Sequence, residues 1–314
     1  MLNRSIYTNK IITYQNQNKM KITEVAKSLI KRNYHKLIVI QESDKGVVMK
    51  ALDEENKLVL LKTFYKIEKF YSFIEDKKSN RSIPKELLFL EQLSQYEYVP
   101  KLIKYIDENN WSTVVMEYLN GDWMNLGEFT MRFADEKLIK IIMINLILIV
   151  YEMSDLGYYH RDIKPENIMI NRETFEVKLI DLEDVLYNID DMPICNSTLG
   201  TIGYQSPEIF GDVPYNLKQS LVFNIGCVAY FCLEFQFPFD TEAETRKCCL
   251  PKMKVSSELA QSFIANCIKL DPDERIEFGE FLSHQWLAKE NRTKSYNPVA
   301  IAKSLWGIFN KMVL

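Results

Sequence analysis

The chain has 314 residues, of which 47% are hydrophobic and 26% charged, as in globular proteins with one large domain or two lobes. Its net charge of −4 argues against a nucleic-acid-binding surface. The longest apolar run, 141–151, is far shorter than the roughly 20 residues of a membrane span, so we expect no transmembrane segment. The N-terminal residues lack an apolar core followed by a small-residue cleavage site, so we expect no secretory signal.

The cysteines favour a reducing compartment. They form no C-x-x-C pair and have no matching histidine spacing, so a cysteine-based metal site is not expected. Free thiols in a cytoplasmic protein are the simpler interpretation, and a nuclear location is not excluded. The six cysteines are Cys195, Cys227, Cys232, Cys248, Cys249 and Cys267.

The first third of the chain predicts a small antiparallel sheet with one helix. Residues 1–34 are polar, with a weak helical pattern over 22–32. Short aliphatic runs joined by polar turns then predict an antiparallel meander. A helix follows, with leucines at helical spacing behind a proline, and two more strand-like runs complete the sheet. The predicted strands cover 36–42, 47–52, 57–63, 102–107 and 112–118, and the predicted helix covers 83–95.

After residue 122 the pattern becomes helical. The first of these helices opens with acidic residues and closes on Gly157, as capping and the helix dipole favour. The predicted helices cover 134–157, 216–235, 256–270 and 276–287. A strand-rich front and a helix-rich back predict an α+β fold of two lobes, with a small-ligand cleft expected where the lobes meet.

The sequence "HRDIKPEN" (160–167), followed by "KLIDLE" (178–183), concentrates polar side chains between two apolar runs. Phosphoryl transfer requires a carboxylate that orients a hydroxyl, an amine beside the phosphoryl group, and oxygen ligands for a divalent metal. Asp162, Lys164, Asn167 and Asp181 are residues of these types. The pattern therefore indicates phosphoryl-transfer chemistry.

These motifs resemble the eukaryotic-type protein kinases over residues 33–288. Further segments match in the expected order, namely "VLLK", "KELLFLEQL", "MEYLNGD", "GTIGYQSPE" and "LDPDERIEF". The resemblance implies a bilobal kinase-like fold with ATP and Mg²⁺ as cofactors. It makes Asp162 the catalytic base, supported by Lys164 and Lys62, and it makes Asn167 and Asp181 the metal ligands.

The resemblance also implies the nucleotide-binding residues. Lys62 would anchor phosphates with Glu86 as its helix partner. The "MEYLNGD" segment would be the hinge, with Met116 as gatekeeper. The implied nucleotide-binding set is Gly46, Val48, Lys62, Glu86, Glu117, Leu119, Asp122, Asn167 and Asp181. Arg275 is expected to pair with Glu208.

The substrate class follows from the same resemblance. Lys164, two residues after Asp162, and Thr201 in the "GT" segment resemble Ser/Thr kinases, so the expected partner is a protein substrate with Ser or Thr hydroxyls. Arg161 resembles the arginine of kinases whose activation loop is phosphorylated, with Ser197 and Thr198 as candidate sites. The alternative, that both are simple loop hydroxyls, stays open.

Two departures from the kinase pattern concern the nucleotide. The phosphate-covering G-x-G-x-x-G loop corresponds to Gln41, Ser43 and Gly46, so two of its glycines are missing and backbone amides approach phosphates less freely. Leu60 replaces the alanine that packs against adenine in the family. Its extra bulk in a tight pocket typically costs about 1–3 kcal/mol.

Two further departures lie in the helical part. The D-F-G motif is Asp181-Leu182-Glu183, and the third carboxylate suggests an altered metal number or preference. The aspartate that anchors the catalytic loop in the family is Leu221 here. Ser220 and Asn224 are the candidates to replace its anchoring role.

The leading functional hypothesis is an active Ser/Thr protein kinase, because the groups that would contact phosphates and metal are all present. The alternative is a pseudokinase, a binding or scaffolding module, which Leu60, Glu183 and the missing glycines favour. A third hypothesis is a kinase-fold enzyme acting on a small molecule, against which the "GTIGYQSPE" segment argues.

The expected domain organisation has three parts. Residues 1–32 are an extension, 33–288 are the kinase domain divided into lobes 33–118 and 119–288, and 289–314 are a tail in which we expect an amphipathic helix that starts at Asn297-Pro298. The tail is expected to dock on the large lobe, bind a partner or touch a membrane, and docking within the chain is the default.

Overall fold

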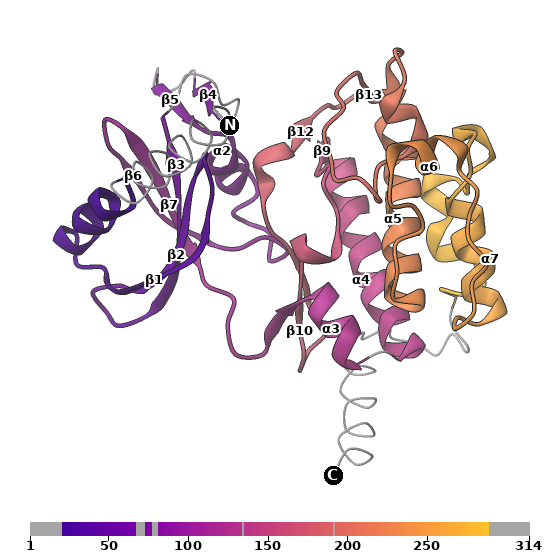
Figure 1. Ribbon diagram of the computed structural model, residues 1–314, viewed down its shortest axis with the longest axis horizontal. Helices are drawn as coiled ribbons and strands as arrows, with labels where there is room; N and C mark the ends of the chain where they lie inside the picture. Colours follow the sequence, from indigo (N-terminus) through magenta and orange to yellow (C-terminus); the bar gives the residue numbers. More distant parts are fainter. Residues whose placement is uncertain (1–20, 67–72, 77–80, 134, 191, 289–314) are drawn as a thin grey trace, which may run out of the picture. The chain divides into compact units, whose positions relative to one another are not determined.

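The computed structural model describes residues 21–66, 73–76, 81–133, 135–190 and 192–288. The chain divides into two compact units between Tyr118 and Leu119. The predicted α+β fold is confirmed, because the first unit is built on a five-stranded antiparallel sheet and the second is mainly helical (Figure 1). The tail helix predicted within 289–314 lies outside the described residues.

The sheet of the first unit has the strand order β1-β2-β3-β7-β6, and every neighbouring pair is antiparallel. The first three strands form the predicted meander. A separate hairpin, β4-β5, leads into helix α2. The elements are a helix over 21–31, β1 (His35–Glu42), β2 (Gly46–Leu52), β3 (Leu58–Tyr65), β4 (Phe73–Asp76), β5 (Arg81–Pro84), α2 (Lys85–Gln92), β6 (Leu102–Asp107) and β7 (Trp111–Glu117).

The two faces of this sheet have different surroundings. On β3, Val59 and Leu61 are buried in a core with Val25 and Leu29 of the 21–31 helix. Because side chains alternate along a strand, Lys62 on β3 belongs to the opposite face. The weak helical pattern near the N-terminus therefore marks a helix that covers one sheet face, and the other face carries the candidate nucleotide-binding residues.

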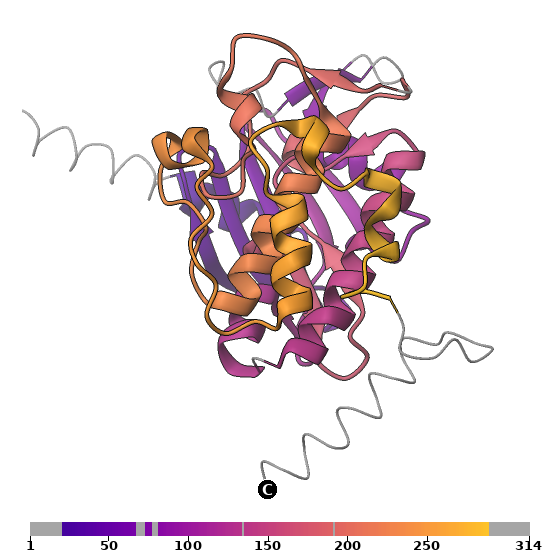
Figure 2. The ribbon, with the colours of Figure 1, turned by 90° about the vertical axis from the view of Figure 1, so that its right-hand side faces the viewer.

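The second unit is built around α4 and α5, with short strands that position its loops. The elements are β8 (Trp123–Asn125), α3 (Leu126–Phe133), α4 (Glu136–Asp155), β9 (Tyr158–Tyr159), η1 (Pro165–Asn167), β10 (Ile168–Asn171), β11 (Val177–Leu179), η2 (Leu182–Asp184), β12 (Leu186–Tyr187), β13 (Ile194–Cys195), η3 (Pro207–Phe210), β14 (Tyr215–Asn216), α5 (Leu217–Glu234), α6 (Glu242–Lys247), α7 (Glu258–Cys267), η4 (Pro272–Glu274) and η5 (Phe278–Ser283). Figure 2 shows this unit from the side of α5 and α7, which pack against each other.

The local sequence explains how α4 begins and ends. The Asp135 side chain caps it by accepting hydrogen bonds from the amides of Lys137 and Leu138, and Gly157 follows its end with φ of +83°. A side chain at Gly157 would also meet Ile189, so glycine is needed at this turn. Within the described ranges, no helix is both long and apolar enough to cross a bilayer.

The helix predicted for 276–287 is wrong in its extent, since only Phe278–Ser283 form a 3-10 helix. The hydroxyl of Tyr151 on α4 donates to the Phe278 carbonyl and accepts from the Phe281 amide at 3.2 Å. These backbone groups are satisfied by a neighbouring helix, so a continuous α-helical ladder is not required.

Candidate active site

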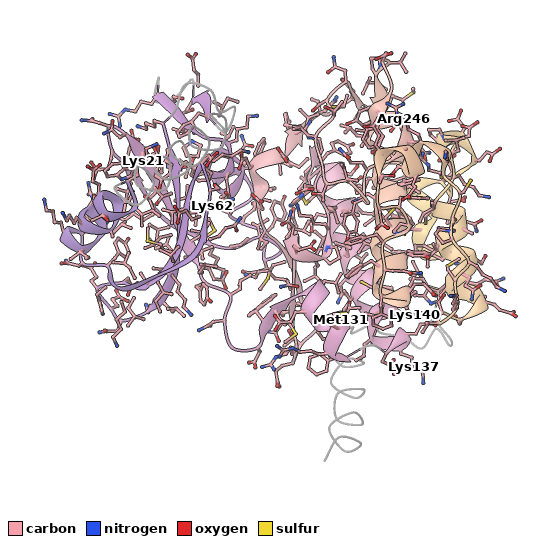
Figure 3. The ribbon with its side chains drawn as sticks, viewed as in Figure 1. Lys21, Lys62, Met131, Lys137, Lys140 and Arg246 are labelled. Carbon is pink, nitrogen blue, oxygen red and sulfur yellow. The ribbon has the colours of Figure 1, made fainter. Side chains whose placement is uncertain are left out.

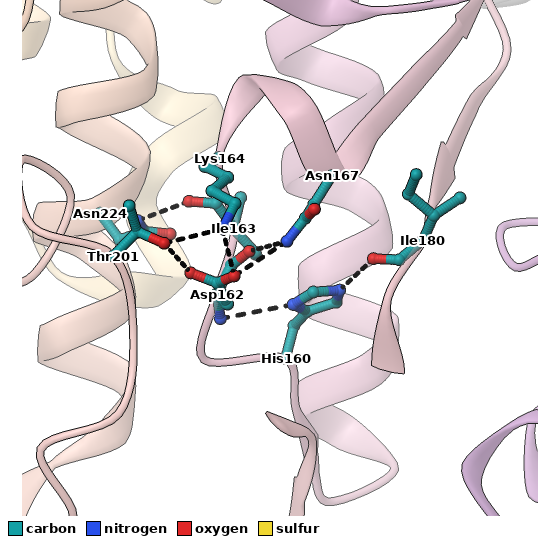
Figure 4. Close-up of polar contacts among 8 residues, drawn as sticks. All are labelled: His160, Asp162, Ile163, Lys164, Asn167, Ile180, Thr201 and Asn224. Carbon is teal, nitrogen blue, oxygen red and sulfur yellow. Dashed lines mark hydrogen bonds and ion pairs between the residues drawn. The ribbon is translucent and has the colours of Figure 1, made fainter. Parts of the chain in front are cut away.

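Three side chains hold the carboxylate of Asp162. Its Oδ1 accepts a hydrogen bond from Thr201 Oγ1 at 2.6 Å, and its Oδ2 accepts from Lys164 Nζ at 2.7 Å and from Asn167 Nδ2 at 3.0 Å (Figure 4). Asn167 Nδ2 also donates to the backbone oxygen of Asp162 at 2.9 Å. Both carboxylate oxygens are therefore fixed in direction, as a group that orients a hydroxyl must be.

Lys164 bonds both Asp162 and Thr201, which are also bonded to each other. Its ammonium donates to Asp162 and also to Thr201 Oγ1 at 2.8 Å. The Lys164 side chain is only 21% exposed. The Lys164 ammonium is therefore held next to the Asp162 carboxylate. At this position it would stabilise negative charge that develops on a phosphoryl group.

His160 supports the loop that carries Asp162 and is not a base. It is almost fully buried, with Nε2 donating to the Ile180 carbonyl at 3.1 Å and Nδ1 accepting from the Asp162 amide at 3.4 Å. Burial lowers its pKa, so the ring is neutral and fits this pattern of one donor and one acceptor. The ring therefore fixes the backbone of Asp162.

Asn167 and Asp181 meet the chemical requirements of a magnesium site. The Asn167 amide nitrogen is occupied by Asp162, which leaves Oδ1 as the atom for a cation. The Ile180 amide donates to the Asn167 carbonyl at 2.9 Å, and Asp181 follows with a left-handed φ of 64° that turns the chain sharply. Among the residues that the structure describes, no three His, Cys, Asp or Glu form a metal-binding group. An amide oxygen and a carboxylate are hard oxygen donors, so these two residues suit Mg²⁺ that would take its other ligands from phosphates and water.

Acidic groups gather next to this pair, on η2. Leu182 is fully buried, so leucine fills the phenylalanine position of the family motif as an apolar side chain. The pKa of Asp184 is raised, first by burial and then by the nearby carboxylates of Asp162 and Glu183. The extra carboxylate of Glu183 thus adds to an already negative region, which a divalent cation would relieve.

In the first unit, Lys62 on β3 forms an ion pair with Glu86 on α2. The nitrogen–oxygen distance is 2.5 Å, and the two side chains are 17% and 3% exposed (Figure 3 labels Lys62). The pair expected from the sequence is present. Its burial holds the ammonium in one place on the sheet face opposite the 21–31 helix.

Three more candidates belong to the same sheet face. Val48 lies opposite Lys62 in the β2-β3 register, and Met116 lies opposite Leu60 in the β3-β7 register. Met116 is buried, whereas Val48 and Leu60 are partly exposed. Leu60 therefore adds bulk to this face of the sheet, at the position where the family has the alanine that packs against adenine.

The turn over residues 41–46 replaces the glycine-rich loop. The Ser43 amide donates to the Gly46 carbonyl at 2.9 Å, the Gly46 amide to the Ser43 carbonyl at 3.3 Å, and the Lys45 amide to Ser43 Oγ at 3.3 Å. These amides are engaged inside the turn, so as it stands the turn offers a phosphate few of them. Glu42 and Asp44 are exposed. The turn therefore offers a polyphosphate few free amide donors and two acidic side chains. It is less suited to its ligand than Asn167 and Asp181 are to a metal ion.

Gly46 has a structural role of its own. A Cβ atom on this residue would lie 1.8 Å from the backbone oxygen of Thr63 on β3. Any larger residue would push β2 away from β3. The one glycine retained from the phosphate-covering pattern is thus required by strand pairing.

The hinge candidates divide between the two units. In the first unit, the Glu117 amide donates to the Lys101 carbonyl at 2.9 Å, and in the second unit Leu119 is partly buried. Asp122 is bound to Arg172, whose Nη2 lies 3.2 Å from its Oδ1, and Arg172 also donates to the Gly121 carbonyl. The sequence analysis missed Arg172, because no local pattern signals a partner 50 positions away.

Arg161 contacts Cys195, two residues before the candidate phosphorylation site Ser197. Its Nε donates to the Asp184 carbonyl at 2.6 Å and its Nη1 to Cys195 Sγ at 3.7 Å. Cys195 Sγ also accepts from the Ser197 amide at 3.4 Å. Ser197 is partly buried and Thr198 exposed.

Arg275 and Glu208 form the predicted ion pair. Both guanidinium nitrogens Nη1 and Nη2 donate to the carboxylate at 2.7 Å, and the Arg275 side chain is fully buried. Two parallel bonds of this kind fix orientation as well as distance. The pair ties the end of the "GTIGYQSPE" segment to the helical core.

Comparison with known proteins agrees with this arrangement. The family described as "Protein kinase domain" matches residues 34–287, so the chain belongs to the protein kinase family. It is 29% identical over 257 residues to a PAS domain-containing serine/threonine-protein kinase of Mus musculus. It is 27% identical over 270 residues to a calcium/calmodulin-dependent protein kinase type 1 of Caenorhabditis elegans, and 28% identical over 211 residues to serine/threonine-protein kinase 1 of African swine fever virus.

The coverage of these relatives differs. The matches take in 80%, 73% and 66% of this chain, in the same order. They span 18% of the mouse protein, 74% of the nematode protein and 70% of the viral protein. The chain therefore corresponds to less than a fifth of the mouse protein's length.

Proposed function

We propose that this chain is an active serine/threonine protein kinase that transfers the γ-phosphoryl group of ATP to protein hydroxyls. The observation that carries the proposal is the fixed Asp162 carboxylate, bonded to Lys164, Asn167 and Thr201. Two of the three relatives named above, the mouse and the viral protein, are serine/threonine-protein kinases, which supports the choice of substrate hydroxyl.

Each residue has a separate task in this proposal. Asp162 orients the substrate hydroxyl and accepts its proton, and Lys164 stabilises charge on the phosphoryl group in transit. Asn167 and Asp181 hold Mg²⁺, and Lys62, held by Glu86, anchors the nucleotide phosphates. Mg²⁺, when bound, neutralises the phosphate oxygens and keeps the transferred group in line.

The test is a transfer assay combined with a binding assay. We expect ATP with Mg²⁺ to raise the melting temperature, and we expect labelled phosphate to reach a protein substrate. Asp162→Ala should reduce transfer by about 10²- to 10⁴-fold. The exposed Asp212 offers a matched control, since Asp212→Ala should leave transfer unchanged. Transfer of equal rate in Asp162→Ala would overturn the proposal.

A second candidate function is a pseudokinase, a binding module without turnover. The 41–46 turn and the bulk of Leu60 favour it, because both weaken the expected nucleotide site. A chain that melts cooperatively, gains no stability from ATP with Mg²⁺ and transfers no phosphate would establish this alternative.

Regulation by phosphorylation at Ser197 or Thr198 is also proposed. The contact of Arg161 with Cys195, two residues before Ser197, supports it, because a phosphate nearby would add an ion pair to Arg161. The alternative of simple loop hydroxyls stays open. Mass spectrometry after incubation with ATP and Mg²⁺, compared for wild type, Ser197→Ala and Thr198→Ala, decides between them. A cytoplasmic location stays a prediction from the cysteine usage.

A further inference from the structure

Asn224 is a polar side chain on α5, a helix whose other inward-facing residues are mostly apolar. Its Nδ2 donates to the carbonyl of Ile163 at 2.8 Å and to the carbonyl of Tyr204 at 3.2 Å. Figure 4 shows Asn224 approaching the loop that carries Asp162. An amide nitrogen has two hydrogens, so both of its donors are in use.

The two carbonyls belong to the two segments that build the candidate active site. Ile163 lies between Asp162 and Lys164. Tyr204 follows shortly after Thr201, whose hydroxyl donates to Asp162. One side chain on a buried helix thus holds both segments at the place where their side chains meet.

The helix that carries Asn224 is itself well fixed. The Asn216 side chain caps its first turn by accepting from the amides of Lys218 and Gln219. Glu234, at its other end, binds the amides of Lys254 and Ser256. In between, α5 packs against α4 and α7. A side chain on α5 is therefore a stable reference point for the loops beside it.

Leu221 lies one helical turn before Asn224, on the same side of α5. Both line a cavity of about 40 Å³ beside the loop, together with His160, Asp162 and Thr201. Leucine has no hydrogen-bonding group. The polar attachment between α5 and the loop is therefore made from position 224, one turn away from where the kinase resemblance places an aspartate.

We infer that Asn224 is a positioning residue, which anchors the backbone at Ile163 and Tyr204 and so holds Asp162, Lys164 and Thr201 in register. It takes over the anchoring that Leu221 cannot provide. The catalytic consequence rests on the proposed function, whereas the anchoring itself does not.

The kinetic test uses Asn224→Asp and Asn224→Ala. Aspartate keeps the shape of asparagine but, when ionised, turns two donors into acceptors that face carbonyl oxygens. We expect kcat to fall by about 10- to 100-fold, because small displacements of a catalytic group have effects of this size. KM for ATP should change less than kcat, since the phosphate-anchoring pair of Lys62 and Glu86 lies outside the two segments that Asn224 holds. Asn266→Ala, at an exposed position on α7, is the matched control and should retain wild-type rates.

A pH profile separates anchoring from simple loss of packing. A protonated carboxylic acid regains one donor, so the activity of Asn224→Asp relative to Asn224→Ala should rise as the pH falls. The same ratio at every pH would contradict the anchoring role. Should Asn224→Asp fail to give a cooperative melting transition, Asn224→Ser replaces it, because serine keeps one donor and should be more active than Asn224→Ala.

Hydrogen exchange tests the anchoring without requiring turnover. Amides in 160–167 and 201–205 should exchange faster in Asn224→Asp than in wild type, and Asn266→Ala should match wild type. Unchanged exchange in both segments would overturn the inference. An inactive wild-type protein that still shows faster exchange in Asn224→Asp would count against the proposed function only, so the two failures are distinguishable.

Discussion

The loop at 160–167 and the turn at 41–46 differ in how they present polar groups. In the loop, side chains hold one another, as Lys164 and Asn167 hold Asp162. In the turn, the amides of Ser43 and Gly46 are bonded within the turn itself. The side chains that transfer would use are present and bonded to one another, whereas the expected phosphate cradle of backbone amides is replaced by an ordinary connection between two strands.

The difference has a physical basis. The loop needs particular side chains, and the loss of any one would leave buried partners without a hydrogen bond. The turn needs only to join β1 to β2, and Gly46 suffices for the close approach to β3. We therefore expect a protein in which transfer chemistry is intact and nucleotide binding is weakened.

The largest expected effect comes from Lys62→Met. It leaves the buried Glu86 carboxylate without its ammonium partner, which typically costs about 3–5 kcal/mol. A strong fall in melting temperature should follow, and transfer should be lost. Adding Glu86→Gln should restore part of the stability but not the transfer.

Lys57→Met serves as its control. Lys57 pairs with Glu55 at the surface, with both side chains largely exposed, so its loss should leave the melting temperature almost unchanged. Equal destabilisation by Lys57→Met and Lys62→Met would contradict the structural importance given to the buried pair.

Glu234→Gln should weaken the helix that supports the loop. The carboxylate accepts hydrogen bonds from the Lys254 amide at 2.7 Å and from Ser256 Oγ at 2.6 Å. Its loss should cost about 2 kcal/mol at neutral pH, because bonds to a charged group are comparatively strong. Calorimetry on wild type and Glu234→Gln measures the difference.

The pH dependence of that difference has a definite sign. Burial raises the pKa of Glu234, but the hydrogen bonds from Ser256 and the backbone amides outweigh burial and leave the pKa below its ordinary value of 4.5. The stabilisation is therefore present above pH 4.5 and is lost as the pH falls through the folded-state pKa. A difference that grows in acid would show that the bonds do not act through the ionised carboxylate.

Leu60→Ala should strengthen nucleotide binding if the face of β3 that carries Lys62 receives the nucleotide. Removing the extra bulk should lower KM for ATP by up to about 10-fold, with kcat nearly unchanged. Leu58→Ala, two residues earlier on the same face of β3, is the matched control. If both variants bind ATP as wild type does, Leu60 is not what limits the site.

The smallest effect is expected from Glu183→Gly. The carboxylate adds negative charge close to Asp184, so its removal should change the relative support of transfer by Mg²⁺ and Mn²⁺. Transfer rates over a range of each metal concentration measure the change. Identical profiles in wild type and variant would rule out a role for Glu183 in metal preference.

Much of the fold could be predicted because it depends on local patterns. The alternation along β3 and the capped start of α4 at Asp135 are set by neighbouring residues. The motif order placed Lys62 with Glu86 and Arg275 with Glu208, and both ion pairs are present.

Other features depend on contacts between distant residues and leave little local signal. The 21–31 helix is stabilised by packing of Val25 and Leu29 on the sheet, so its own pattern is weak. Within 276–287 only η5 forms, and the hydroxyl of Tyr151 bonds two of its backbone groups. Asn224 was one of two candidates for anchoring the loop, and only its contact with Ile163 distinguishes it from Ser220, which pairs with Ser206.

The most direct test of the central claim is single-turnover phosphoryl transfer at increasing concentrations of ATP with Mg²⁺. We predict transfer that saturates only at high nucleotide concentration in the wild type and that is about 10²- to 10⁴-fold slower in Asp162→Ala at every concentration. A folded wild-type protein that transfers no phosphate at any concentration, or an Asp162→Ala variant with wild-type transfer, would contradict the account.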